Sequence, residues 1–110
     1  MKIERELMRG AGPAAVLRLL APAERYGYEL VQILEKQSDG VLAMGQSTLY
    51  PLLYNLEAKG LIASRVETAD NGRDRKYYRL TGRGKRQLVR YRKQWEQLTI
   101  AMGKLGVLGA

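Results

Sequence analysis

Residues 45–62 constrain the fold of this chain more than any other stretch. An apolar residue recurs there at the spacing i, i+3, i+4 and i+7, which defines one face of an α-helix, at Leu49, Leu52, Leu53 and Leu56. Ser47 and Thr48 are expected to cap the start of this helix, and Pro51 to lie in its first turn, where a missing N–H costs little. Gly60 is expected to end it in a left-handed conformation.

The opposite face of this helix indicates what it contacts. An ordinary solvated face would carry Lys and Glu, but this one has small, aromatic and amide side chains: Ser47, Pro51, Tyr54, Asn55 and Ala58, flanked by Thr48 and Tyr50. Such side chains suit contact with base edges, thymine methyl groups and phosphate oxygens. A plain amphipathic helix with an unusual surface is the alternative, and the neighbouring segments must decide between them.

The charge of the chain indicates a polyanionic partner. The net charge is +8 over 110 residues, and ten of the basic residues lie between positions 73 and 93, where only Asp74 opposes them. Hydrophobic residues make up 45% of the chain and charged residues 27%, as expected for one small globular domain with a core.

Two helices are expected before residue 45. Residues 1–9 predict a short helical arm, which residues 10–12 (Gly-Ala-Gly) should interrupt, and residues 13–21 predict the first helix of the core. A second helix is expected over residues 26–37, and residues 41–42 are expected to pair briefly as an edge strand. The side chains expected to point inward on the two helices are Val16, Leu17, Leu20, Leu30, Ile33 and Leu34.

A hairpin is expected directly after the leucine-rich helix. Residues 61–67 alternate as a half-buried strand does, with Ile62, Ser64 and Val66 on one face. Residues 68–74 form a turn with Asn-Gly at its tip, a strong hairpin signal, and residues 76–80 return with Tyr78 and Leu80 inward.

The last helix carries a heptad-like seam. Thr81 can cap it, and apolar residues then follow at spacings of 3, 4, 3, 4 and 3 at Leu88, Tyr91, Trp95, Leu98, Met102 and Leu105. Residues 1–80 already bury three helices, so they cannot cover the whole seam, which predicts a homodimer through Leu88, Tyr91, Trp95, Leu98 and Met102. Residues 1–80 are thus the expected DNA-binding domain, and residues 81–110 the dimerisation helix. Trp95 is expected to anchor the interface; stacking against a small aromatic effector is the alternative role.

Three helices followed by a hairpin is the order of a winged helix-turn-helix, so the fold expected is mainly α with a small β-hairpin. In such folds the third helix enters the major groove and the hairpin reaches the backbone beside it. The expected partner is double-stranded DNA, with a pseudo-palindromic operator if the protein is a dimer. The residues expected to contact it are Ser47, Thr48, Tyr50, Pro51, Tyr54, Asn55, Arg73, Arg75 and Lys76, together with Tyr28 at the start of the second helix.

An ordered set of short motifs resembles the PadR family of bacterial transcriptional regulators in its short form. The motifs are Arg9-Gly10, Tyr26-Gly27-Tyr28-Glu29-Leu30, Thr48-Leu49-Tyr50-Pro51, Leu56-Glu57, Gly60-Leu61-Ile62, Gly72-Arg73, Arg75-Lys76-Tyr77-Tyr78 and Leu80-Thr81-x-x-Gly84. The similarity covers roughly residues 8–100. It implies a homodimeric winged-helix repressor whose last helix dimerises, and which a ligand or signal often releases from DNA.

Other classes of function are weakly supported. The chain has no His and no Cys, its turn acids Asp39, Asp70 and Asp74 do not form a metal cluster, and no phosphate-binding loop is visible. An enzyme, a metal site and a cofactor are therefore not expected. A winged-helix adaptor that binds protein instead of DNA remains the alternative, although the basic hairpin favours DNA.

A membrane role is also not expected. The narrow seam of the last helix suits a partner helix better than a lipid surface. No apolar run approaches the length of a membrane span and no signal peptide is visible, so the expected location is the cytoplasm.

Overall fold

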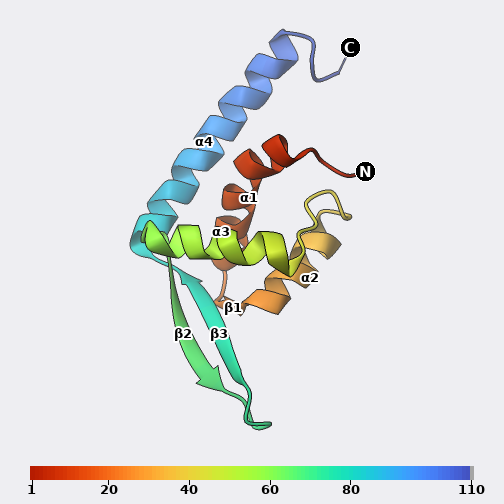
Figure 1. Cartoon of the computed structure of the whole chain (residues 1–110). Helices are drawn as coiled ribbons and strands as arrows, with labels where there is room; N and C mark the ends of the chain where they lie inside the picture. Colours follow the sequence, from red (N-terminus) through yellow and green to blue (C-terminus); the bar gives the residue numbers. More distant parts are fainter. Residues whose placement is uncertain (110) are drawn as a thin grey trace.

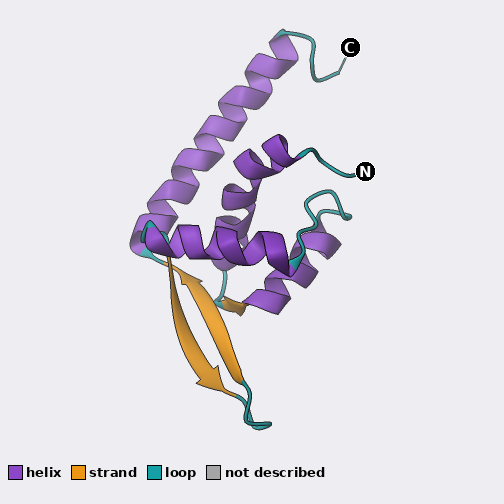
Figure 2. Ribbon diagram, viewed as in Figure 1, coloured by secondary structure: helices purple, strands orange, loops and turns teal. Residues whose placement is uncertain are grey.

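The apolar helix predicted within residues 45–62 lies at the centre of the molecule, with two helices packed behind it and a hairpin projecting from one end (Figure 1). The structure is a computed structural model and describes residues 1–109. The elements within this range, in chain order, are α1 (Arg5–Leu20), β1 (Arg25–Tyr26), α2 (Gly27–Gln37), α3 (Gln46–Ala58), β2 (Ile62–Thr68), β3 (Asp74–Leu80) and α4 (Gly82–Lys104). Helices dominate, as Figure 2 shows, and the predicted winged helix-turn-helix is confirmed.

The core is built from the predicted apolar stripes. Leu49 and Leu53 of α3 are fully buried, and they pack among leucines of α1, α2 and the base of the hairpin. Ile33 is only half-buried, whereas the other predicted inward residues of α1 and α2 are buried. Full burial of a leucine side chain contributes about 1.5–3 kcal/mol, so the leucines of α3 fix which face of the helix turns outward.

The start of α3 differs from the prediction, whereas its end agrees with it. The N-cap is the extended Gly45, whose carbonyl accepts the N–H groups of Thr48 (3.1 Å) and Leu49 (3.0 Å). Ser47 and Thr48 therefore lie inside the first turn and do not cap the helix. Pro51 is likewise inside the helix rather than in its first turn.

At the other end of α3, Gly60 has a φ of 74°, and it donates its N–H to Glu57 O at 2.9 Å. The N–H of Leu61 reaches Leu56 O at 3.0 Å, which completes a Schellman motif. The predicted left-handed stop at Gly60 is therefore confirmed.

The predicted break in the first helix is wrong, because α1 runs without interruption through Gly10, Gly12 and Pro13. Gly12 is buried against the α3 side of the core. A methyl group at this position would lie 3.1 Å from Met44 Cε and 3.3 Å from Leu52 Cδ2. The glycine therefore serves close packing of α1 instead of ending the helix, and the arm and the first core helix are one element.

The strand predicted at residues 41–42 is also wrong. Asp39 and Gly40 both have positive φ values, 52° and 81°, and the N–H of Leu42 donates to Ser38 Oγ at 2.9 Å. This compact turn uses the amides that an edge strand would offer to a neighbour. The third strand is instead β1, which pairs with β3 through Arg25↔Tyr78 and gives the sheet order β1-β3-β2.

The hairpin of β2 and β3, called the wing below, is buried only at its base. Its register runs from Ile62↔Leu80 to Thr68↔Asp74, and a loop over residues 69–73 closes it, with Gly72 at a φ of 79°. Ile62, Tyr78 and Leu80 are buried, as predicted for the last two. Val66 faces water with 62% of its surface exposed, because the outer half of the wing extends beyond the helices (Figure 1).

Helix α4 begins at the base of the wing and then extends away from the body of the protein (Figure 1). Thr81 caps it as predicted, since its Oγ1 accepts the N–H of Gly84 at 3.0 Å. Leu88 and Tyr91 pack against the core, whereas Trp95 and Leu98 are 40% and 48% exposed. Within residues 1–109 no helix is both long enough and apolar enough to cross a membrane.

We predict that Gly84→Ala destabilises the fold and that Gly82→Ala, two residues earlier in the same helix, does not. A methyl group at position 84 would overlap the carbonyl oxygen of Leu61 and would lie only 2.7 Å from Leu80 Cδ1. The Leu61 carbonyl cannot easily move, because it accepts a hydrogen bond from the N–H of Thr81. Overpacking of this kind costs about 1–3 kcal/mol. At position 82 the nearest group is Arg86 Nη1 at 3.7 Å, and alanine there should be neutral or add up to about 1 kcal/mol.

Urea unfolding of the two variants beside the parent protein measures both effects. Equal unfolding midpoints for Gly84→Ala and Gly82→Ala would contradict the close approach of α4 to the backbone of Leu61.

Candidate nucleic-acid interface

The outer face of α3 carries exposed neutral side chains. Ser47, Thr48, Pro51 and Asn55 all reach the surface, and Tyr54 is the most open of them with 74% of its surface exposed. The burial of the leucine stripe on the far side of the helix forces this arrangement. A face of hydroxyl, amide and aromatic groups without a fixed charge can approach base edges without the desolvation penalty of an unpaired ion.

A hollow lies on one side of α3, between α2 and the wing. It has a volume of about 340 Å³, is called the wing-side hollow below, and is lined by Tyr26, Gly27, Tyr28, Tyr50, Asp74, Arg75, Lys76 and Tyr78. Four predicted DNA contacts, Tyr28, Tyr50, Arg75 and Lys76, therefore meet at one place. The N-terminus of α2 opens here as well, and its partial positive charge favours an anion.

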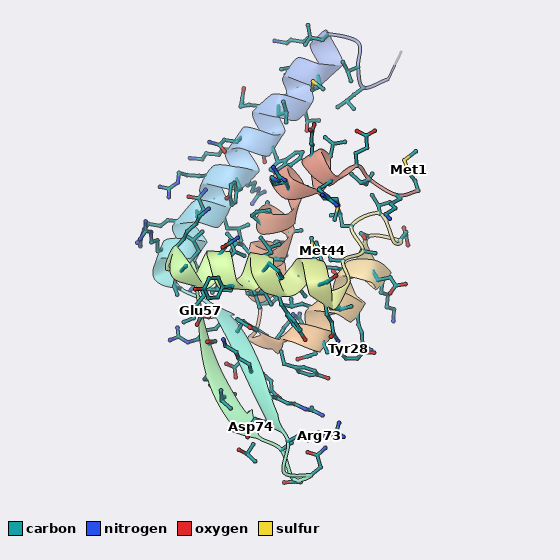
Figure 3. All side chains as sticks on the ribbon, in the orientation of Figure 1. Met1, Tyr28, Met44, Glu57, Arg73 and Asp74 are labelled. Atoms are coloured by element: carbon teal, nitrogen blue, oxygen red, sulfur yellow. The ribbon has the colours of Figure 1, made fainter. Side chains whose placement is uncertain are left out.

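Gly27 makes this convergence possible. A methyl group at position 27 would lie 2.5 Å from Tyr50 Cε1, so only glycine lets the ring of Tyr50 cross the start of α2. Tyr28, labelled in Figure 3, lies on the same helix start and is about half exposed. Two phenol groups from different helices thus border the hollow, and both can donate a hydrogen bond to a phosphate oxygen.

The three predicted wing cations occupy different environments. Arg73 lies in the wing loop (Figure 3), where its backbone N–H donates to Asn71 Oδ1 at 3.0 Å and its side chain is exposed. Arg75 stacks its guanidinium 4.9 Å from the ring centroid of Tyr26. Lys76 is engaged with α3, because its Nζ lies 3.6 Å from Glu57 Oε1.

Glu57 connects α3 to both strands of the wing. Its Oε2 accepts a hydrogen bond from Ser64 Oγ at 2.5 Å, and its other oxygen faces Lys76. Figure 3 shows Glu57 at the end of α3 from which the wing descends. Sequence reasoning did not assign this residue a role, although Glu57 is the one charged side chain between Gln46 and Ala58.

A second set of contacts holds the outer face of the sheet. Arg65 donates from Nε to both carboxylate oxygens of Glu24 at 3.1 Å, and from Nη1 to Glu67 at 3.1 Å. These hydrogen bonds lower the pKa of Glu24 and raise that of Arg65. Because two carboxylates neutralise it, Arg65 is a structural cation, in contrast to Arg73. On the inner face, burial raises the pKa of Tyr78.

A second hollow lies on the other side of α3, against the start of α1. It has a volume of about 370 Å³ and is called the arm-side hollow below; its lining is Arg5, Met8, Arg9, Pro13, Met44, Ser47, Thr48, Pro51, Leu52 and Asn55. Four further predicted DNA contacts, Ser47, Thr48, Pro51 and Asn55, therefore border it. Arg5 and Arg9 were not predicted to contact DNA. Their i, i+4 spacing at the start of a continuous α1 was the available signal, and the expected break at Gly10 concealed it.

The predicted dimerisation residues form a separate surface on α4. Leu88 and Tyr91 are half-buried against the core, and Trp95, Leu98 and Met102 follow them along the helix away from the body. Trp95 borders a shallow depression with Arg92, Glu96, Thr99 and Ile100, where Arg92 Nε lies 3.3 Å from Glu96 Oε1. In residues 1–109, no three His, Cys, Asp or Glu side chains are grouped so that they could hold a metal ion.

Comparison with known proteins identifies relatives of this architecture. The family model described as "Transcriptional regulator PadR-like family" matches residues 16–90. The transcriptional regulator Rv3488 of Mycobacterium tuberculosis is 37% identical over 94 residues, which is 86% of this chain and 84% of that protein. These matches are to transcriptional regulators and not to enzymes, in agreement with the sequence-based expectation.

Solved structures of similar fold are also of transcriptional regulators of this family. The PadR family transcriptional regulator from Eggerthella lenta is 38% identical, with a TM-score of 0.83 over 94% of this chain and 88% of that chain. Bacillus subtilis PadR in complex with operator DNA is 27% identical, with a TM-score of 0.69 over 74% of this chain and 47% of that chain.

We predict that Glu57→Ala loosens the wing while leaving the core intact. The substitution leaves Ser64 and Lys76 without their partner on α3, and loss of one hydrogen bond and a half-exposed ion pair costs about 1 kcal/mol. Amides of the outer parts of β2 and β3 should then exchange faster with deuterium, with no change in the leucines of α3.

Glu67→Ala is the matched control, because Glu67 pairs with Arg65 on its own strand and leaves the wing attached to α3. If both variants exchange at the same rate in the wing, Glu57 does not hold it.

Proposed function

The chain belongs to the PadR-like family of transcriptional regulators, and from this premise we propose that it is a homodimeric repressor that binds an operator in double-stranded DNA. One observation carries the proposal: a hollow lies on each side of the neutral outer face of α3, and each hollow is lined by basic side chains. A neutral face between two cationic borders fits a helix that reads bases in the major groove while its neighbours contact phosphates. Bacillus subtilis PadR, the structural neighbour in complex with operator DNA, supports DNA as the partner.

Asn55 and Tyr54 are the proposed readers of sequence. Both are exposed on α3 and neither contributes to the core. The amide of Asn55 can pair with adenine N6 and N7 in a bidentate contact, and the ring of Tyr54 can stack on a sugar or a thymine methyl group. Ser47 and Tyr50, at the borders of the face, are proposed to contact phosphates.

The wing is proposed to act through charge. Arg73 in the wing loop is free to reach the backbone, and the wing-side hollow offers Arg75, Lys76 and the start of α2 to a phosphate. Because Glu57 already pairs with Lys76, this lysine should contribute less to the salt dependence of binding than Arg73.

The dimer is proposed to form through α4. Trp95 and Leu98 leave a large apolar surface exposed, and they continue the seam that Leu88 and Tyr91 begin against the core. A two-fold pair would place two α3 helices about 34 Å apart for adjacent major grooves of a pseudo-palindromic operator. Occupation of that site by a dimer excludes other proteins from it, which is why we propose repression.

Release of the DNA by a small aromatic effector remains a proposal that rests on Trp95. The partly exposed indole of Trp95 can stack against a planar compound. Its position in the apolar seam favours the other role, that of an interface anchor. The winged-helix adaptor without DNA binding is the competing function, and the experiments below separate the two.

We predict that Asn55→Ala lowers affinity for the operator and leaves affinity for random duplex nearly unchanged. Loss of one bidentate base contact costs about 1–3 kcal/mol of discrimination, whereas nonspecific binding depends on phosphate contacts that the variant retains. Genomic fragments recovered with the purified protein supply the operator, and fluorescence anisotropy measures both affinities.

Gln97→Ala, which removes an exposed amide from α4, is the control and should change neither affinity. A wild-type ratio of the two affinities in Asn55→Ala would show that α3 is not read through this residue. Absence of a preferred fragment with the parent protein would favour the adaptor.

We predict that the double variant Leu98→Lys, Met102→Lys is monomeric and binds the operator weakly, because it places two charges in the apolar seam. Analytical ultracentrifugation measures the oligomeric state, and anisotropy measures binding. The double variant Gln97→Lys, Ala101→Lys adds the same charge at the same spacing on α4, at exposed positions outside the seam, and should remain dimeric. A dimeric Leu98→Lys, Met102→Lys protein would mean that the seam is wrongly assigned.

A further inference from the structure

The start of α1 borders the outer face of α3 on the side opposite the wing. The arm-side hollow places Arg5 and Arg9 beside Thr48 and Asn55. A neighbouring hollow of about 460 Å³ shares Arg5, Met8 and Thr48 with it and extends to Lys2. The two form one continuous depression from Asn55 to the N-terminal residues, with three cations along it.

The guanidinium groups of Arg5 and Arg9 are free to bind an anion. Arg5 and Arg9 are exposed, and within residues 1–109 neither forms an ion pair or a side-chain hydrogen bond. Arg65 and Arg92, by contrast, are each neutralised by a glutamate. Glu4 and Glu6, the nearest acids in sequence, do not line either hollow.

The side of the depression formed by α3 suits the same ligand. Ser47 and Thr48 do not cap the helix, so their hydroxyls remain available beside Arg5 and Arg9. Hydroxyl donors next to guanidinium groups are the combination that binds phosphodiester oxygens. The absence of carboxylates from the depression means that nothing within it competes with phosphate for these cations.

We propose that Arg5 and Arg9 contact phosphates of the DNA strand that borders α3 on the side away from the wing. This inference rests on the proposed function, because it assumes that α3 enters the major groove. Phosphates border the major groove on both sides, and the wing supplies cations to only one of them. The arm of α1 supplies cations to the other, so the recognition helix is held from both sides.

The double variant Arg5→Gln, Arg9→Gln tests the proposal. Binding to a duplex of about 30 base pairs is measured against salt concentration. The slope of log affinity against log salt should decrease in magnitude by about 0.9 for each lost phosphate contact, hence by about 1.8 for each bound subunit. Operator and random duplex should lose affinity by the same factor, because phosphate contacts carry no sequence information.

The control is Lys36→Gln, Lys104→Gln, which removes the same net charge from the last turns of α2 and α4. Its slope should remain that of the parent. The variant Arg5→Lys, Arg9→Lys keeps both charges and should restore most of the slope. Circular dichroism checks the fold, because a variant in which α1 unfolds would lose helical signal.

The outcomes separate the two proposals. If the parent protein binds duplex and the Gln variant has the slope of the control, the contact by α1 is refuted and the proposed function stands. If the parent protein binds no duplex at all, the proposed function is refuted and the inference with it.

Discussion

The burial of three leucines of α3 is the constraint on which the rest of the structure depends. Leu49, Leu53 and Leu56 are almost completely removed from water among leucines of α1 and α2. Since each contributes about 1.5–3 kcal/mol, the helix cannot rotate about its axis without losing much of the core. Its opposite face, with Tyr54 and Asn55, is therefore directed outward by packing that involves neither residue.

Two glycines let other elements approach the borders of that face. Gly27 accommodates the ring of Tyr50 at the start of α2, and Gly12 accommodates Met44 and Leu52 at the side of α1. Each border then receives cations from a different part of the chain. In the proposed interface, the neutral side chains in the centre contribute specificity and the charges at the borders contribute affinity, as in nucleic-acid interfaces generally.

The helical periods and the Asn-Gly turn were sufficient to predict the winged fold, because leucine spacing and turn chemistry act locally. The helix break predicted at Gly12 and Pro13 was wrong, because tertiary packing outweighs the tendency of glycine and proline to break a helix. The outer face of α3 was predictable from the same period. The contacts of Glu57 and the placement of Arg5 and Arg9 beside α3 were not predictable, since they depend on the packing of elements far apart in the chain.

We propose that DNA contacts the outer face of α3 with the wing on one side and the start of α1 on the other. Chemical-shift mapping by NMR during titration with duplex DNA tests it most directly. We predict large shifts at Tyr54, Asn55, Arg73 and the start of α1. The indole of Trp95 should have the same shifts in the free and the DNA-bound protein. Shifts concentrated on α4, with the outer face of α3 unchanged, would contradict it.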